Sequence, residues 1–205
     1  METTIIGILI VILIASAFFN AITWSFNWIA VAILAAVWVI LLYNRFVSLV
    51  NRAKEAWSDI QVQLKRRYDL IPNLVETVKG YAKHESGTLE KVIQARNMAL
   101  AAKTVGERAE AENILSSTLK SLFAVTEAYP ELKANQNFMS LQEELTSTEN
   151  KIAFSRQFYN DSVMTFNTQI EVFPQNIIAG IFHFVRREFF EVKDQAAREA
   201  PKVSF

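Results

Sequence analysis

The feature that most restricts this fold is a run of 38 residues, Ile5–Leu42, without a single charged side chain. As one α-helix the run would be about 57 Å long, nearly twice the roughly 30 Å hydrocarbon core of a bilayer. A single straight crossing therefore does not account for all of it. Polar residues and tryptophans, which are typical of a membrane–water boundary, lie together near its middle: Asn20, Thr23, Trp24, Ser25, Asn27 and Trp28. The run is thus expected to divide into two apolar segments.

The second apolar segment, residues 24–43, is long enough to span a bilayer and is predicted to be a transmembrane helix. Residues 5–22 would measure about 27 Å as a helix, which is marginal for a second crossing. A signal peptide is excluded because the start carries Glu2 and no Lys or Arg, although Ala15-Ser16-Ala17 resembles a cleavage site. The first arm of a hairpin, which we favour, and an apolar helix buried between protomers remain open.

The charges indicate how the chain is oriented. All 21 Lys and Arg residues follow Asn44, and Arg45, Arg52 and Lys54 come soon after the apolar run. Basic residues next to a membrane span usually stay on the cytoplasmic side. The sequence therefore predicts that the C-terminal domain lies in the cytoplasm.

Beyond the apolar run, hydrophobic residues recur every three or four positions, the spacing of helices with one buried face. With only 5 Gly and 4 Pro, the fold class is predicted to be all-α. We expect a membrane-anchored antiparallel bundle of three long helices plus a short C-terminal helix. The expected ranges are 44–83 (continuous with the anchor and kinked near Tyr68–Pro72), 88–128 (broken near Lys103–Gly106), 131–172 and 175–190.

Three regions follow from this pattern. Residues 1–43 form the hydrophobic membrane segment, 44–174 the cytoplasmic bundle, and 175–205 an apolar aromatic tail. In the tail, eight apolar residues fall within fourteen positions, more than one face of a short helix can hide. The closing Pro201, Val203 and Phe205 predict an extended end that is docked on the protein.

The sequence offers little for catalysis. There is no Cys, and the only histidines are His84, expected in a turn, and His183, expected to be partly buried in the tail. No Gly-rich phosphate loop, nucleophile elbow or metal-binding pair of residues occurs. We therefore predict no catalytic residue, no metal site, no cofactor and no enzyme activity. The net charge of +0 gives no reason to expect nucleic acid as a partner.

Polar residues on or near the apolar faces are the remaining candidates for a site. One interpretation is a solvated face; the other is a polar layer between helices, which can fix their register. Asn160 and Asn167, seven residues apart, would lie on one side of the third helix. The candidate interhelical polar layer consists of Arg67, Asn73, Glu149, Arg156, Asn160 and Asn167.

Several of these residues lie in motifs through which the chain resembles the LemA family of bacterial membrane-anchored helical proteins. The motifs are Lys65-Arg66-Arg67-Tyr68-Asp69-Leu70-Ile71-Pro72-Asn73, Glu127-Ala128-Tyr129-Pro130, Thr148-Glu149-Asn150, Arg156 and Tyr159-Asn160. The resemblance favours the interpretation as a polar layer. It implies one short anchor before Tyr43-Asn44, whereas this chain has about twenty additional apolar residues there.

Two functions are consistent with these observations. The favoured one is a non-enzymatic, self-associating membrane scaffold in the inner membrane of a bacterial cell, with a role in envelope stress or membrane organisation that the resemblance implies. The alternative is an accessory or regulatory subunit of a membrane enzyme such as a membrane protease. The expected partners are the lipid bilayer, further copies of the chain and, for the alternative, another membrane protein.

Overall fold

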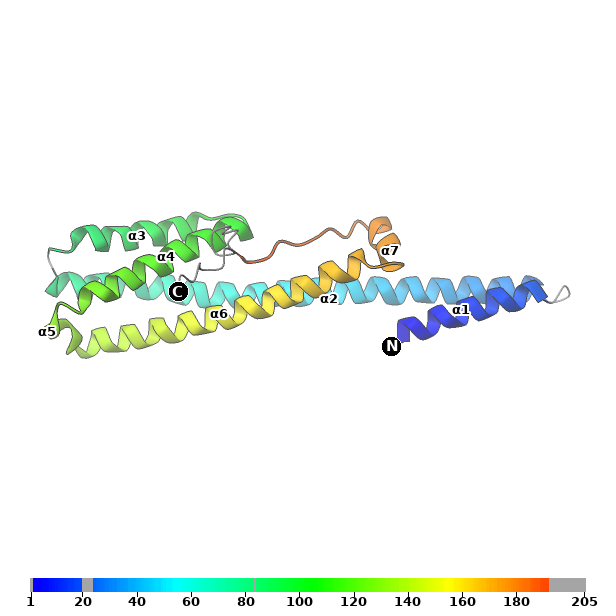
Figure 1. Ribbon diagram of the computed structural model, residues 1–205, viewed down its shortest axis with the longest axis horizontal. Helices are drawn as coiled ribbons and strands as arrows, with labels where there is room; N and C mark the ends of the chain where they lie inside the picture. The colour runs from blue at the N-terminus through cyan, green and yellow to red at the C-terminus, as the bar shows by residue number, and fades with distance from the viewer. Residues whose placement is uncertain (1, 20–23, 83, 192–205) are drawn as a thin grey trace, which may run out of the picture. The chain divides into compact units, whose positions relative to one another are not determined.

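The computed structural model describes residues 2–19, 24–82 and 84–191, and all regular elements in these ranges are helices. The prediction of an all-α chain is therefore confirmed. The predicted docked end at Pro201, Val203 and Phe205 lies outside the described residues. In chain order the helices are α1 (Glu2–Phe19), α2 (Trp24–Tyr81), α3 (Ser86–Ala101), α4 (Val105–Thr126), α5 (Pro130–Lys133), α6 (Gln136–Glu171) and α7 (Gln175–Ile181) (Figure 1).

The chain forms two compact units. The first contains Met1–Lys54 and Ser162–Arg187, and the second contains Glu55–Asp161 and Glu188–Phe205. Helices α2 and α6 each contribute a segment to both units, and so does the tail after α7. Each unit therefore combines parts of the chain that are far apart in the sequence.

Helix α2 has 58 residues and runs without interruption from the apolar segment into the charged one. Its buried residues recur mostly every three or four positions, for example Ala53, Ala56 and Ile60, all 0% exposed. Among the described residues, α2 is the one helix long and apolar enough to cross a membrane by length and composition. The apolar part of α1, Thr4–Ser16, is shorter.

Pro72 lies inside α2, which continues through it. A proline has no backbone N–H, so the carbonyl four residues earlier loses its helical partner. That carbonyl belongs to Tyr68, and it instead accepts a hydrogen bond from Arg96 Nε of α3 at 2.8 Å. Arg96 therefore replaces the bond that Pro72 removes, which helps the helix to continue where the sequence contains a helix breaker.

We expect Arg96→Met to lower the free energy of unfolding by about 1–3 kcal/mol, because the Tyr68 carbonyl would lose its donor. In a Pro72→Ala background the same substitution should cost much less, since the alanine restores an N–H for that carbonyl. The measurement is a double-mutant cycle from unfolding followed by circular dichroism in detergent. Equal costs of Arg96→Met in the two backgrounds would contradict the exchange of donors.

The second of the three expected long helices is in fact two helices, α3 and α4, which pack against each other (Figure 1). Ala102 ends α3 in an extended conformation with ψ 129°. Thr104 and Glu107 then form a capping box, in which each side chain accepts a hydrogen bond from the backbone N–H of the other residue. The break predicted near Lys103–Gly106 is confirmed, and it turns the chain back.

The third expected helix also begins later than predicted. Pro130 opens the single-turn helix α5, and Asn135 Oδ1 accepts a hydrogen bond from Phe138 N–H at 3.1 Å. This side-chain bond makes Asn135 the cap of a new helix, α6, which then continues to Glu171.

The C-terminal helix predicted for 175–190 is wrong in length, because α7 ends at Ile181 and the chain is irregular from there to Glu191. His183 adopts φ 56°, and Phe184 N–H donates to the Ala179 carbonyl at 2.9 Å. A left-handed residue with this bond ends a helix, and histidine tolerates that conformation better than most residues do. His183 is exposed, contrary to the expectation that it is partly buried.

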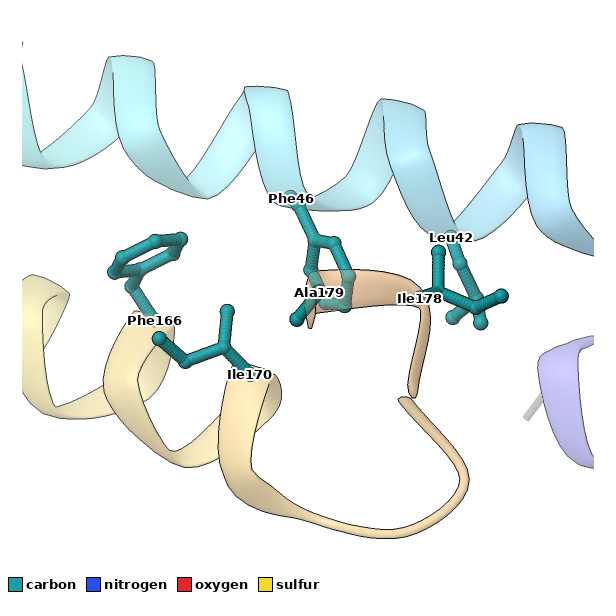
Figure 2. Close-up of a cluster of buried hydrophobic side chains, with 6 residues drawn as sticks. All are labelled: Leu42, Phe46, Phe166, Ile170, Ile178 and Ala179. Atoms are coloured by element: carbon teal, nitrogen blue, oxygen red, sulfur yellow. The ribbon is translucent and has the colours of Figure 1, made fainter. Parts of the chain in front are cut away.

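The first unit has a hydrophobic core formed by an internal stretch of α2, the C-terminal end of α6, and α7. Leu42 and Phe46 of α2 pack with Phe166 and Ile170 of α6, and α7 contributes Ile178 and Ala179 (Figure 2). All six are at most 7% exposed. The Phe184 ring of the tail lies 5.1 Å from the Phe46 ring. The tail is therefore part of this core rather than an appendage.

Candidate functional site

A group of charged and hydroxyl side chains, buried at its centre, joins α2, α4 and α6 in the second unit. Its centre is Arg67, which is 2% exposed. Arg67 Nη1 lies 3.3 Å from Glu112 Oε2 and 2.7 Å from Glu149 Oε2, and Nη2 donates to Ser116 Oγ at 2.8 Å. We call Arg67, Tyr68, Glu112, Ser116 and Glu149 the Arg67 cluster.

Glu112 is the most enclosed member, with 0% of its surface exposed. Its second oxygen accepts a hydrogen bond from the Tyr68 hydroxyl. Burial raises the pKa of Glu112, although the bond from Tyr68 and the charge of Arg67 act in the opposite direction. The pKa of Tyr68 is raised, first by burial and then by the bond to Glu112.

Sequence reasoning missed Glu112, although a signal was present. In α4 the buried leucines Leu115, Leu119 and Leu122 follow steps of four and three. Glu112 lies three residues before Leu115 and so continues that apolar stripe. An acidic residue on a buried stripe needs a cation, and Arg67 is that cation.

Arg156 of α6 lies close enough to influence the charges of this cluster. Burial lowers its pKa, while the charges of Glu149 and Glu112 act to raise it. Its Nε is buried and has no hydrogen-bond partner among the described residues. The guanidinium stands 4.9 Å above the centre of the Phe190 ring, a cation–π contact. The formal charges of Arg67 and of the neighbouring Arg156 thus balance those of Glu112 and Glu149.

This arrangement suits the alignment of helices better than it suits chemistry. Buried charges are costly unless each has a partner, so sliding one helix along another would separate Arg67 from Glu112. The Ser116 hydroxyl donates to Glu149 Oε1 at 3.1 Å, so this hydroxyl also links α4 to α6. Across the described ranges there is no group of three or more His, Asp or Glu side chains arranged to hold a metal ion.

The second structural feature of the site is the binding of the tail in the second unit. The Phe190 side chain is 0% exposed. Its ring lies 5.4 Å from the Trp57 ring, which in turn lies 5.3 Å from Tyr159. Together with Arg156, these side chains form a cage of aromatic and cationic groups from α2 and α6 around the tail residue.

Asn160 holds the backbone of the same tail residue. Its Oδ1 accepts from Phe190 N–H at 2.8 Å, and its Nδ2 donates to the Phe190 carbonyl at 3.4 Å. We call such a pair of bonds to one residue an asparagine bracket. The neighbouring Tyr159 hydroxyl donates to the Glu188 carbonyl at 2.9 Å.

A second asparagine bracket occurs in the first unit. Asn167 Oδ1 accepts from Arg187 N–H at 2.9 Å, and Nδ2 donates to the Arg187 carbonyl at 3.0 Å. Seven residues of helix rise by about 10.5 Å, and three residues of extended chain by about 10 Å. The spacing of the two asparagines on α6 therefore matches the spacing of the two tail residues they bind.

The six residues of the predicted polar layer have three different environments. Arg67 and Glu149 meet in the Arg67 cluster, and Arg156 lies beside it. Asn160 and Asn167 bind the tail backbone instead of another long helix. Asn73 is exposed on α2. The tail could not be predicted as the partner of these asparagines, because amide-to-backbone bonds leave no pattern in the residues of the bound segment.

A small cavity of about 190 Å³ borders the Arg67 cluster. Its walls include Arg67, Ser116 and Glu149 together with Lys120 and Asn150. Such a space accommodates a few water molecules against charged groups, which suits a structural cluster.

These features can be compared with known proteins. A family model described as the LemA family matches residues 56–205, which include the Arg67 cluster and both asparagine brackets. The chain belongs to the LemA family. The resemblance drawn from the sequence motifs is thereby confirmed.

Relatives of this LemA-family chain include magnetosome proteins. MamQ 2 of Paramagnetospirillum magneticum is 25% identical over 181 residues, covering 76% of this chain and 66% of MamQ 2. MamQ of Magnetospirillum gryphiswaldense is 24% identical with the same coverage. Protein LemA of Metamycoplasma hominis is 29% identical over 138 residues, covering 66% of this chain and 63% of that protein. The matches span just under two thirds of the relatives' own length.

Proposed function

We propose that this LemA-family chain is a non-enzymatic scaffold, anchored in the inner membrane of a bacterial cell by the first part of α2 and self-associating. Its C-terminal part would lie in the cytoplasm, as the distribution of basic residues favours. The observation that carries the proposal is the continuity of α2, which leads from an uncharged, exposed apolar segment into the buried Arg67 cluster.

The exposure of the apolar segment supports an anchor. Ile29, Ile33 and Ile40 are 57–58% exposed, so their side chains need lipid or a protein neighbour. The segment of residues 24–43 has the length that a bilayer requires. Whether residues 5–22 also cross the membrane stays a prediction.

The pairing of side chains in the second unit supports an antiparallel arrangement of α2 and α6. Trp57 contacts Tyr159, whereas Arg67 pairs with Glu149, ten residues earlier on α6. Compared with the same Trp57–Tyr159 contact, Arg66 lies later on α2 and its partner Glu144 lies earlier on α6. Residue numbers rise on one helix as they fall on the other, as expected in an antiparallel bundle. The buried pair of Arg67 with Glu112 of α4 would help to keep the scaffold in one register.

A role in membrane organisation fits the names of the relatives. The MamQ proteins are named for the magnetosome and not for a reaction. The polar groups of the Arg67 cluster are already paired with one another, which supports a structural use. We infer that the protein organises a membrane region through repeated copies of itself.

The proposal is tested by measuring the mass and imaging the particles of the full chain after extraction in mild detergent. We expect particles of uniform size that contain many copies of the 23.3 kDa chain. Light scattering that separates protein mass from detergent mass gives the copy number. A monodisperse single chain would contradict self-association and would favour the alternative, an accessory subunit of a membrane enzyme.

A further inference from the structure

Exposed apolar side chains occur in the turn between α6 and α7, on α7 and just after it, within the first unit. Phe173 is 79% exposed and Ile181 is 61% exposed, although the core of the same unit lies directly behind them. Solitary apolar residues on a surface are ordinary, but a contiguous group marks a contact surface. We call this group the α7 corner; it consists of Val172, Phe173, Ile177, Ile181, Phe182 and Val185.

Contacts with α2 determine the position of the α7 corner along that helix. Ile178 and Ala179 of α7 pack on Leu42 and Phe46, and the Phe182 ring lies 4.9 Å from the Tyr43 ring. Figure 2 shows that the turn after α6 extends along α2 about as far as Leu42. The corner therefore lies beside the last apolar turn of α2, where the uncharged run ends.

The exposed apolar surface of α2 extends to the residues beside the α7 corner. Val37, Ile40 and Leu41 are 38–57% exposed, and Tyr43 is 40% exposed. The first charged residue of α2 after them is Arg45. On the tail, Arg186 is exposed and pairs with Glu171 through Nε at 3.0 Å. An apolar surface that ends in tyrosine and arginine is what a membrane–water interface selects.

We propose that the α7 corner inserts into the interfacial region of the bilayer, on the face from which α2 emerges. This rests on the proposed anchor, because the position of the span sets the depth of the corner. The helix from Trp38 to Phe46 covers about 12 Å, and each interfacial region is roughly 5–7 Å thick beyond the hydrocarbon core. The corner packs within that stretch. Its continuity with the exposed apolar surface of α2 makes lipid its occupant.

The membrane contact gives the α7 corner a function, which is to orient the protein relative to the bilayer. The span alone allows the protein to tilt, whereas a second contact at the interface fixes the angle at which α2 leaves the bilayer. The protein thus has two membrane contacts, one helix that crosses the bilayer and one short helix that lies at its surface.

Site-specific fluorescence of the full chain in vesicles tests the inference, and the absence of natural Cys makes single labels possible. Phe173→Cys and Ile181→Cys variants carry an environment-sensitive dye in vesicles of zwitterionic and anionic phospholipid. We expect a nitroxide attached near the lipid headgroup to quench both labels, and iodide in the water to leave them largely unquenched.

Two control sites make the outcomes distinct. Phe154→Cys, on an equally exposed residue (74%) of the second unit, should be quenched by iodide and not by lipid. Ile33→Cys should be quenched by a nitroxide deep in the lipid. If the label at position 33 responds to lipid but those at 173 and 181 respond only to iodide, the inference is wrong and the anchor stands. Shielding at 173 and 181 from both quenchers would mean that a second copy covers the corner, which also overturns it. If no label responds to lipid, the proposed anchor fails as well.

Discussion

Replacement of Arg67 by Met is expected to lower the free energy of unfolding by about 3–5 kcal/mol, the usual cost of leaving one partner of a buried ion pair alone. Glu112, which is 0% exposed, would be left as an unpaired buried charge. The Glu149 side chain is 46% exposed and can be hydrated instead. Thermal unfolding of the detergent-solubilised protein, followed by circular dichroism, measures the change.

The double variant Arg67→Met, Glu112→Gln separates the charge from the packing. Glutamine can still accept the hydrogen bond from Tyr68 but carries no charge, so the double variant should be more stable than Arg67→Met alone. If it is less stable, the buried charge is not the cause of the loss.

The pH dependence of Arg67→Met provides a second check. Burial already raises the pKa of Glu112, and loss of Arg67 removes an interaction that lowers it. The folded variant then holds a proton that the unfolded chain releases above about pH 4.3. The contribution of Glu112 to stability should therefore be fully present below that pH and be lost as the pH rises through the folded pKa, which is measured as the difference from the double variant. The double variant should lack this dependence.

The second large effect is expected for Phe190→Ala, about 3–5 kcal/mol, because a fully enclosed aromatic ring is removed from between Trp57 and Arg156. The tail should then come away from α6. Hydrogen exchange at residues 188–190, with peptides analysed by mass spectrometry, reports this release directly.

Asn160→Leu tests whether the asparagine bracket and the cage act on one segment. Loss of the bracket leaves the Phe190 N–H without its acceptor, at a cost of roughly 1–3 kcal/mol. Combined with Phe190→Ala, the two costs should sum to more than the double variant loses, because either change alone frees the segment. Full additivity would mean that ring and backbone are held independently.

The helices were predictable from the sequence because apolar spacing is a local property. The steps of three and four along α2 extend through Pro72, and the structure follows them, with Arg96 supplying the donor that proline lacks. The break after α3 was also predictable, because Lys103–Gly106 interrupts the apolar spacing; the structure adds the capping box of Thr104 and Glu107. That this break reverses the chain depends on contacts between α3 and α4, which spacing alone does not contain.

The candidate site was predictable only in part. Arg67 and Glu149 could be singled out as charges near apolar faces. Glu112, the other acidic partner of Arg67, was not, because it lies in a stretch where alanines and glutamates interrupt the apolar pattern. The prediction of a helix in the tail was wrong for a different reason. Residues 182–190 resemble an amphipathic helix in composition, but side chains on α6 supply the hydrogen bonds that an extended backbone otherwise lacks.

The asparagine brackets have a consequence for how this segment can vary. Each bracket recognises an N–H and a carbonyl, which nineteen of the twenty amino acids provide and proline does not. The side chain of Arg187 takes no part in its bracket, so that position is free to change while the docking persists. The bound segment can thus carry different outward-facing side chains while its backbone stays attached to the same helix.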